Sequence, residues 1–161
     1  MFRSNQSFHI VFASAMKKDY GVSPLMIGAQ SGLVWTYKDP VDVRSFSAAI
    51  PIRVSADNCD DTAICLWYTS PILSLNDPED TRYALLGEPN KWTAVSQQRF
   101  KSIENDVQKQ QTVITVEGVK GEVIPVHIFH STLQVVQVNC TITSANDQAN
   151  IVITASKVVC S

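Results

Sequence analysis

The sequence predicts an all-β protein, folded as an antiparallel β-sandwich of jelly-roll or immunoglobulin-like topology. Short runs rich in valine, isoleucine and aromatic residues recur along the whole chain, and glycine, proline, asparagine and aspartate separate them at close intervals. With 161 residues, no internal repeat and no long linker, the chain fits one domain of ordinary size. We therefore expect a single sandwich domain spanning residues 1–161.

The expected strands follow one another with little between them. Residues 8–15 alternate in the manner of a strand, which favours a strand there over the alternative, a cleaved signal peptide within residues 1–15. Pro51 has no backbone N–H, so its arm belongs at a sheet edge or a bulge. The expected strands cover residues 8–15, 25–29, 33–37, 41–46, 48–55, 62–69, 83–86, 111–118, 121–130, 132–143 and 150–154.

One segment departs from the strand pattern. Residues 96–107 lack alternation, and Phe100, Ile103 and Val107 recur at helical spacing. Ser96 could cap the first turn of such a helix. We therefore expect one short helical segment near residues 96–107.

The cysteines leave the compartment of the protein open. Disulfides would place the chain in an oxidising compartment, whereas buried free thiols behave as small apolar side chains in any compartment. The triplets Asn5-Gln6-Ser7 and Asn139-Cys140-Thr141 match the N-glycosylation pattern, but two matches are expected by chance in a chain rich in Asn, Ser and Thr. The cysteines number four, which allows three pairings: Cys59, Cys65, Cys140 and Cys160.

Residues 135–160 resemble a closing hairpin, with two apolar arms around a polar turn near residues 144–149. In a regular hairpin Cys140 and Cys160 would lie roughly 23 Å apart along the ladder. A disulfide needs Cα atoms within about 7 Å. The two cysteines could therefore bond only if the chain turns again near Ser156-Lys157. Cys59 and Cys65 could bond only across a tightly folded loop.

Composition and charge argue against several classes of function. The formal net charge is −2, from 13 basic and 15 acidic residues, and a nucleic-acid binder needs a dense basic surface instead. No apolar run approaches the ~20 residues of a membrane span. The sequence contains no glycine-rich phosphate loop and no G-x-S-x-G element, so a non-enzymatic role is favoured.

Two acidic loops, residues 57–61 and 76–80, carry the oxygen ligands that calcium prefers. We expect no cofactor, because such loops commonly solvate strand ends; the alternative is a calcium site, with Asp57, Asp60 and Asp61 as the better group of ligands. His127 and His130 lie three apart on an expected strand, so their side chains point to opposite faces and cannot share one metal without a bulge.

The three tryptophans have different surroundings. Trp35 lies on the more apolar face of its strand, and Trp67 lies in a run that is apolar on both faces, so both are expected in the core. Trp92 follows the turn-prone loop that contains Asn90 and Lys91. We expect these three loop residues to bind a ligand; the alternative is that Trp92 plugs one end of the sandwich.

These observations lead to three hypotheses of function. The first is a non-enzymatic recognition or adhesion module that binds protein or glycan, located outside the cell or on a virion surface. The second is a self-assembling structural subunit such as a viral coat protein, because low charge and abundant Ser, Thr and Gln suit flat contacts between copies. The third is a hydrolase acting on glycans through acidic residues far apart in the sequence.

Overall fold

The structure, a computed structural model, describes residues 9–14, 20–22, 31–37, 39–50, 52–54, 64–143 and 146–161. The regular elements among them are strands, and every strand pair is antiparallel, which confirms the predicted all-β class. The chain forms two compact units. The C-terminal unit contains Leu73–Pro89 and Thr93–Ser161; the N-terminal unit contains the described part of Gln6–Ile72 together with Asn90–Trp92. A single domain over residues 1–161 stays a prediction.

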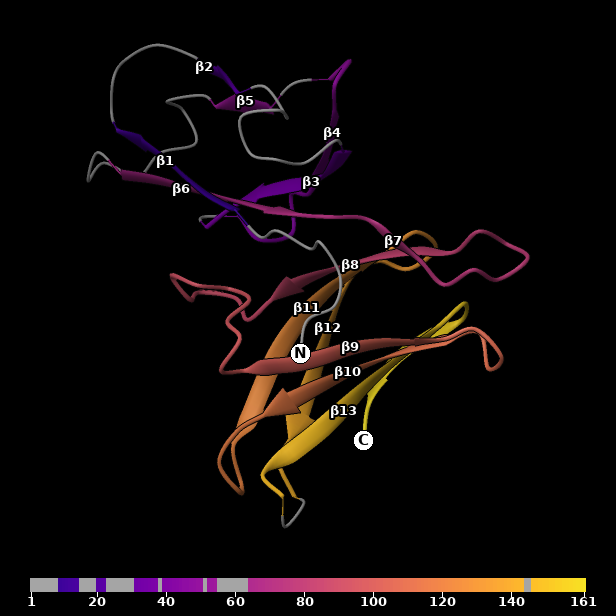
Figure 1. The fold of residues 1–161 in the computed structure, drawn as a ribbon. Helices are drawn as coiled ribbons and strands as arrows, with labels where there is room; N and C mark the ends of the chain where they lie inside the picture. Colours follow the sequence, from indigo (N-terminus) through magenta and orange to yellow (C-terminus); the bar gives the residue numbers. More distant parts are fainter. Residues whose placement is uncertain are drawn as a thin grey trace. The chain divides into compact units, whose positions relative to one another are not determined.

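The C-terminal unit consists of two four-stranded sheets, ordered β12-β11-β8-β7 and β14-β13-β10-β9 (Figure 1). Four successive hairpins alternate between these sheets: β7 with β8, β9 with β10, β11 with β12, and β13 with β14. The strand order of both sheets is thus known from the structure, whereas the sequence did not predict it. The strands are β7 (Leu73–Ser74), β8 (Arg82–Gly87), β9 (Phe100–Asp106), β10 (Gln111–Glu117), β11 (Val123–His130), β12 (Gln134–Thr141), β13 (Gln148–Thr154) and β14 (Lys157–Cys160).

The inner faces of these two sheets form the core of the C-terminal unit. Alternate residues of the central strands, such as Ile114 on β10 and Ile128 on β11, are completely buried. Polar contacts also join the sheets, because the Thr112 hydroxyl on β10 donates a buried hydrogen bond of 3.0 Å to the Tyr83 hydroxyl on β8. Burial raises the pKa of the Tyr83 phenol, since its charged form would lose its hydration. The result is the predicted β-sandwich.

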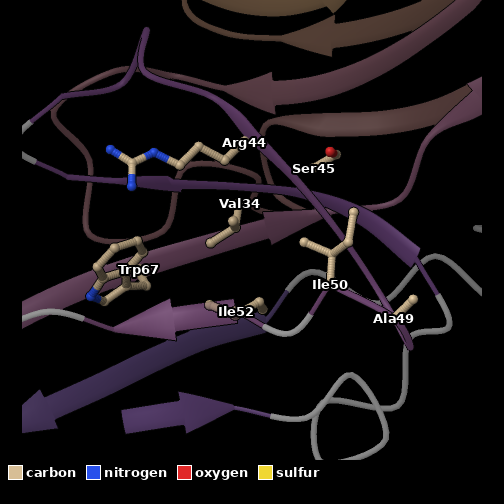
Figure 2. A pocket seen from close by; sticks show the side chains of 7 residues that line it. All are labelled: Val34, Arg44, Ser45, Ala49, Ile50, Ile52 and Trp67. Atoms are coloured by element: carbon tan, nitrogen blue, oxygen red, sulfur yellow. The ribbon is translucent and has the colours of Figure 1, made fainter. Parts of the chain in front are cut away.

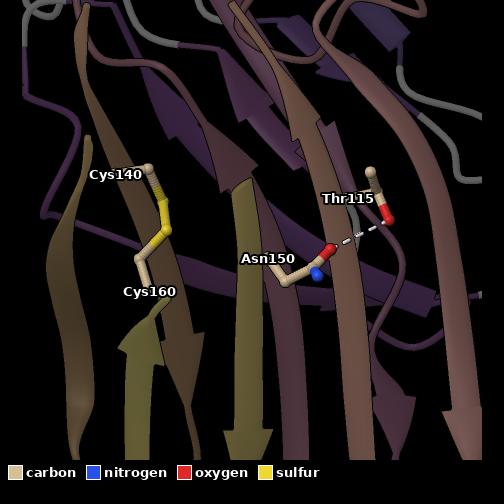
Figure 3. The surroundings of a disulfide bond; sticks show 4 residues. All are labelled: Thr115, Cys140, Asn150 and Cys160. Carbon is tan, nitrogen blue, oxygen red and sulfur yellow. Dashed lines mark hydrogen bonds between the residues drawn. A yellow bond between two sulfur atoms is a disulfide. The ribbon is translucent and has the colours of Figure 1, made fainter. Parts of the chain in front are cut away.

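A disulfide connects Cys140 and Cys160, with Cα atoms 5.3 Å apart, as Figure 3 shows. Cys140 lies on β12, an edge strand of one sheet, and Cys160 lies on β14, an edge strand of the other. The expected closing hairpin is therefore wrong, because β12 and β13 belong to different sheets and do not pair. The second turn, however, is present at residues 155–156, where Thr154 pairs with Lys157. That turn brings Cys160 back beside β12, as the disulfide requires.

The expected helix over residues 96–107 is also wrong: residues 97–99 form a turn and β9 follows it. The register of β9 against β10 shifts, so that Ser102 faces Thr115 while Phe100 faces Val116, and Lys101 is an extra residue. This β-bulge lets Phe100 and Ile103 both face the inner side although they are three residues apart. The apparent helical spacing is thus the signature of a bulged edge strand.

The N-terminal unit contains a sheet ordered β1-β6-β3-β4 and a separate pair, β2 with β5. Gly32 on β3 faces Phe46 on β4, and a Cβ at Gly32 would lie 2.5 Å from the Ser70 carbonyl oxygen and 2.9 Å from the Phe46 ring. Only glycine permits this approach. The strands are β1 (His9–Ser14), β2 (Tyr20–Val22), β3 (Ser31–Thr36), β4 (Arg44–Ser47), β5 (Ile52–Val54) and β6 (Ile64–Ser70).

Most of the expected strands are present. The strand predicted at residues 8–15 is β1, which pairs with β6. Residues 25–29 lie outside the described part of the chain, as do Pro51 and the expected arm's end at residue 55. In the ranges that the structure describes, no helix has the length and apolarity of a membrane span.

Candidate functional site

The backbone between β8 and β9 forms a loop that begins at Gly87. Gly87 has a φ of +87°, and a Cβ there would lie 2.1 Å from the Ala94 carbonyl oxygen. The Glu88 N–H donates to that same carbonyl at 2.8 Å and closes the loop. Asn90, with a φ of +61°, occupies the left-handed region that asparagine tolerates better than most residues. The sequence thus specifies a tight turn that presents residues 90–92.

Two tyrosines of the N-terminal unit hold the tip of this loop. The Tyr68 hydroxyl on β6 donates to the Lys91 carbonyl at 2.7 Å, and the Tyr37 hydroxyl donates to the Asn90 carbonyl at 3.4 Å. Tyr68 is buried and stacks on Trp35, with ring centroids 5.7 Å apart. Burial raises the pKa of Tyr68 to about 12. Tyr68 therefore stays a neutral donor, and the loop backbone has a fixed position.

The side chains of the loop tip point to solvent. Trp92 is 64% exposed, an unusual value for the largest apolar side chain, and Asn90 and Lys91 are exposed as well. Tyr37, which donates the hydrogen bond to the Asn90 carbonyl, is itself 39% exposed. We call Tyr37, Asn90, Lys91 and Trp92 the Trp92 site. It offers aromatic surface together with amide and ammonium hydrogen-bond donors.

The other two tryptophans are core residues, as predicted. Trp35 is 3% exposed and Trp67 is 2% exposed. Trp35 faces Tyr68 across β3 and β6, while Trp67 is the next residue before Tyr68 on β6 and lies on the opposite face of the sheet. The strand pattern distinguished the exposed tryptophan from the two buried ones.

A cavity of about 370 Å³ lies on the Trp67 side of the N-terminal sheet. Figure 2 shows Trp67 and Arg44 at one end and Ala49 at the other, with isoleucine side chains between them. The Arg44 guanidinium hydrogen-bonds to Asp42, and this bond raises the pKa of Arg44. Among the described residues that line it, the cavity is therefore mainly apolar, and the cation there, Arg44, already has a carboxylate partner. It is lined by Val34, Arg44, Ser45, Ala49, Ile50, Ile52 and Trp67.

Arg99 is the centre of a polar cluster in the C-terminal unit. Its guanidinium donates to Glu88 at 3.1 Å, to Glu122 at 2.7 Å and to the Glu117 carbonyl at 2.7 Å. Burial lowers the pKa of Arg99, but the hydrogen bonds and charges of Glu122 and Glu88 raise it by more than burial lowers it, so the pKa is raised overall. A Cβ at Gly118 would lie 2.9 Å from this guanidinium. Arg99 forms ion pairs with both carboxylates, so this cluster connects loops and is poorly suited to acid–base chemistry.

The preferred calcium ligands, Asp57, Asp60 and Asp61, lie outside the described residues. In the second acidic loop, one Asp77 oxygen accepts a 2.7 Å hydrogen bond from the Thr81 N–H, and hydrogen bonding from Thr81 lowers the pKa of Asp77. Asp80 accepts from Arg82 at 2.7 Å. Each of these two aspartates thus supports the turn between β7 and β8. Within the described part of the chain, no three His, Cys, Asp or Glu side chains gather as metal ligands would.

The two histidines of β11 lie on opposite faces, as predicted. The Nε2 atom of His130 lies 2.9 Å from the Thr154 carbonyl oxygen on the facing sheet, and its Nδ1 atom accepts two backbone N–H groups at 3.2 and 3.3 Å. The Nε2 atom of His127 instead forms a 3.0 Å hydrogen bond with the side-chain Oε1 atom of Gln137. His130 is therefore a cross-sheet connector in the C-terminal unit.

Of the four cysteines, Cys59 and the side chain of Cys65 lie outside the described part of the structure. Asn90, Lys91 and Trp92 were predicted together as loop residues, whereas the tyrosines that hydrogen-bond to this loop, Tyr37 and Tyr68, were not predicted. No local signal could have found them, since 23 residues separate Tyr68 from Lys91. No model of a known protein family matches this sequence, and no curated protein matches it either.

Proposed function

We propose that the protein is a non-enzymatic recognition module that binds a glycan or a protein through the Trp92 site. One observation carries the proposal: a tryptophan that is 64% exposed follows directly on a loop backbone held by a buried tyrosine. A rigid aromatic side chain loses little conformational entropy on binding. Exposed tryptophans on fixed loops are accordingly common anchors of binding interfaces.

A glycan is the ligand that the chemistry of the site favours. The apolar face of a sugar ring stacks on an aromatic ring, and Trp92 and Tyr37 both offer exposed aromatic surface. The Asn90 amide and the Lys91 ammonium are exposed donors in the same loop and could bind sugar hydroxyls. A protein ligand would use Trp92 as a buried hot spot instead.

The Cys140–Cys160 disulfide supports an extracellular or virion-surface location, because disulfides persist in oxidising environments. We accordingly propose that the ligand is met outside the cytoplasm.

The test is a binding screen of the full chain against a glycan array and against extracellular protein fractions. We expect a glycan ligand whose affinity falls at least 30-fold in Trp92→Ala, corresponding to the about 2 kcal/mol that defines a hot spot. Val119→Ala is the matched control, because Val119 is 74% exposed but lies in the C-terminal unit, away from the Trp92 loop in sequence. Equal losses in both variants, or a ligand indifferent to Trp92, would reject the proposal.

A second candidate function is a self-assembling structural subunit such as a coat protein. Val113, Val152 and Val159 face one another in register across β10, β13 and β14 and form an apolar row on the outer face of their sheet. All three keep solvent exposure, and Val159 is 39% exposed. Sedimentation velocity over a range of concentrations tests this role: assembly that is lost in Val159→Lys supports it, and a monomer at every concentration contradicts it.

A further inference from the structure

The strand β12 is an edge strand with an unusual composition. It is eight residues long, and its sequence, QVVQVNCT, contains three valines and no charged residue. One edge strand of the facing sheet, β9, has charged residues and a bulge instead, and the other, β14, is joined to β12 by the disulfide. Charges and bulges are the usual protection of a sheet edge against pairing with another chain. Uncharged, β-branched edges without them are prone to association.

The triplet Asn139-Cys140-Thr141 lies in this strand, and its alternation separates the three side chains. Cys140 is completely buried and forms the disulfide with Cys160. Asn139 and Thr141 are exposed and face the opposite, outer side. The side-chain Oδ1 atom of Asn139 accepts a 3.2 Å hydrogen bond from the Gln137 side-chain amide, and the Asn139 Nδ2 atom is the other polar atom of this exposed side chain.

The same triplet thus contains a disulfide-bonded cysteine and two exposed residues, Asn139 and Thr141, that form an N-glycosylation pattern. Disulfides form in the oxidising compartment in which secretory proteins also meet the N-glycosylation machinery. The pattern alone was uninformative, whereas its combination with the disulfide and with outward-facing Asn139 and Thr141 is specific. From this combination we infer that Asn139 carries an N-linked glycan, which shields the β12 edge. This inference is independent of the Trp92 site.

The modification requires one co-reactant, an oligosaccharide linked to a lipid diphosphate, and the transferase of the secretory pathway. The Asn139 amide nitrogen attacks the anomeric carbon of the first sugar. The bond between that carbon and the diphosphate oxygen breaks, an N–C bond forms, the lipid diphosphate leaves with the bonding electrons, and the amide loses one proton. The Thr141 hydroxyl completes the pattern that the transferase recognises.

The glycan would also cover apolar surface beside β12. Thr141 is paired with Val123 on β11, and Val123 is 56% exposed. A sugar chain that starts at Asn139, two residues along the same face, can extend over Val123 and along the free side of β12. The uncharged edge would then need no charged residue of its own to prevent association.

The experiment uses the full chain, secreted from eukaryotic cells behind a cleavable leader, with Asn5→Gln introduced throughout to remove the other triplet. Intact mass is measured before and after treatment with an N-glycosidase. We expect one glycan mass that the enzyme removes. It should be absent from Asn139→Gln and Thr141→Ala and retained in Thr141→Ser, which preserves the pattern.

Secreted protein that contains the Cys140–Cys160 disulfide but no removable glycan would overturn the inference. A glycan that persists in Asn139→Gln would overturn it as well. For the shielding role, the native glycoprotein is compared with its enzymatically deglycosylated form by sedimentation velocity. We expect removal of the glycan to increase association at equal concentration, and unchanged sedimentation would overturn the shielding role.

Discussion

Removing the Cys140–Cys160 disulfide should destabilise the C-terminal unit by a predictable amount. The bond closes a loop with a sequence separation of 20 residues. In the chain-entropy model, such a crosslink stabilises the fold by about 3 kcal/mol, since it restricts the unfolded chain. The double variant Cys140→Ala/Cys160→Ala should lose this contribution. With a urea slope of about 1–3 kcal/mol/M, its unfolding midpoint should fall by about 1–3 M.

Circular dichroism is the appropriate probe for this unfolding experiment. The three tryptophans all belong to the N-terminal unit, so their fluorescence would not report on the C-terminal sandwich. Reductant added to the double variant is the control, because it isolates any effect of Cys59 and Cys65. A double variant that unfolds at the same urea concentration as the oxidised parent would refute the idea that this disulfide stabilises the sandwich by joining the edge strands β12 and β14.

Three further predictions concern the loops and the tyrosines. Gly87→Ala should destabilise the protein by at least about 2 kcal/mol more than Gly121→Ala in urea unfolding, because both glycines have positive φ but only a Cβ at Gly87 meets backbone, the Ala94 carbonyl; equal costs would contradict the close approach. Arg99→Lys should lower the free energy of unfolding by about 1–3 kcal/mol in the same assay, since lysine cannot reproduce the bidentate contact with the Glu122 carboxylate. An unchanged unfolding midpoint would show that this contact does not stabilise the protein. The pKa of Tyr68 is raised from 10.0 to about 12 in the folded protein, so its contribution to the free energy of unfolding should be fully present below pH 10 and should be lost between pH 10 and 12. The free energy of unfolding of Tyr68→Phe should therefore fall less over this pH range; identical pH profiles of the two proteins would contradict this assignment.

The sequence predicted the all-β class and most strands because half-buried strands impose a period of two on the chain. That period survives in β10, where burial alternates without interruption. It failed in β9, because the bulge at Lys101 replaces the period of two by a spacing of three. The sequence pattern also did not indicate that β12 and β13 lie in different sheets. Pairing between neighbours in sequence is only a tendency, and the hydrophobic pattern does not say which sheet a strand joins.

The candidate site was predicted only in part, for a similar reason. Trp92, Asn90 and Lys91 lie together in one turn-prone loop, so their proximity could be read from the sequence. Their supporting residues, Tyr37 and Tyr68, come from strands that the fold brings to this loop. Long-range placement of this kind depends on tertiary packing and leaves no local signal.

The central claim, recognition through Trp92, is tested most directly by a fluorescence titration with the glycan that the array identifies. Trp35 and Trp67 are buried, so Trp92 dominates quenching of the emission by acrylamide. We predict that the ligand shifts the emission to shorter wavelength and protects it from acrylamide, and that both changes vanish in Trp92→Phe. Saturable binding that leaves the emission and its quenching unchanged would contradict the claim.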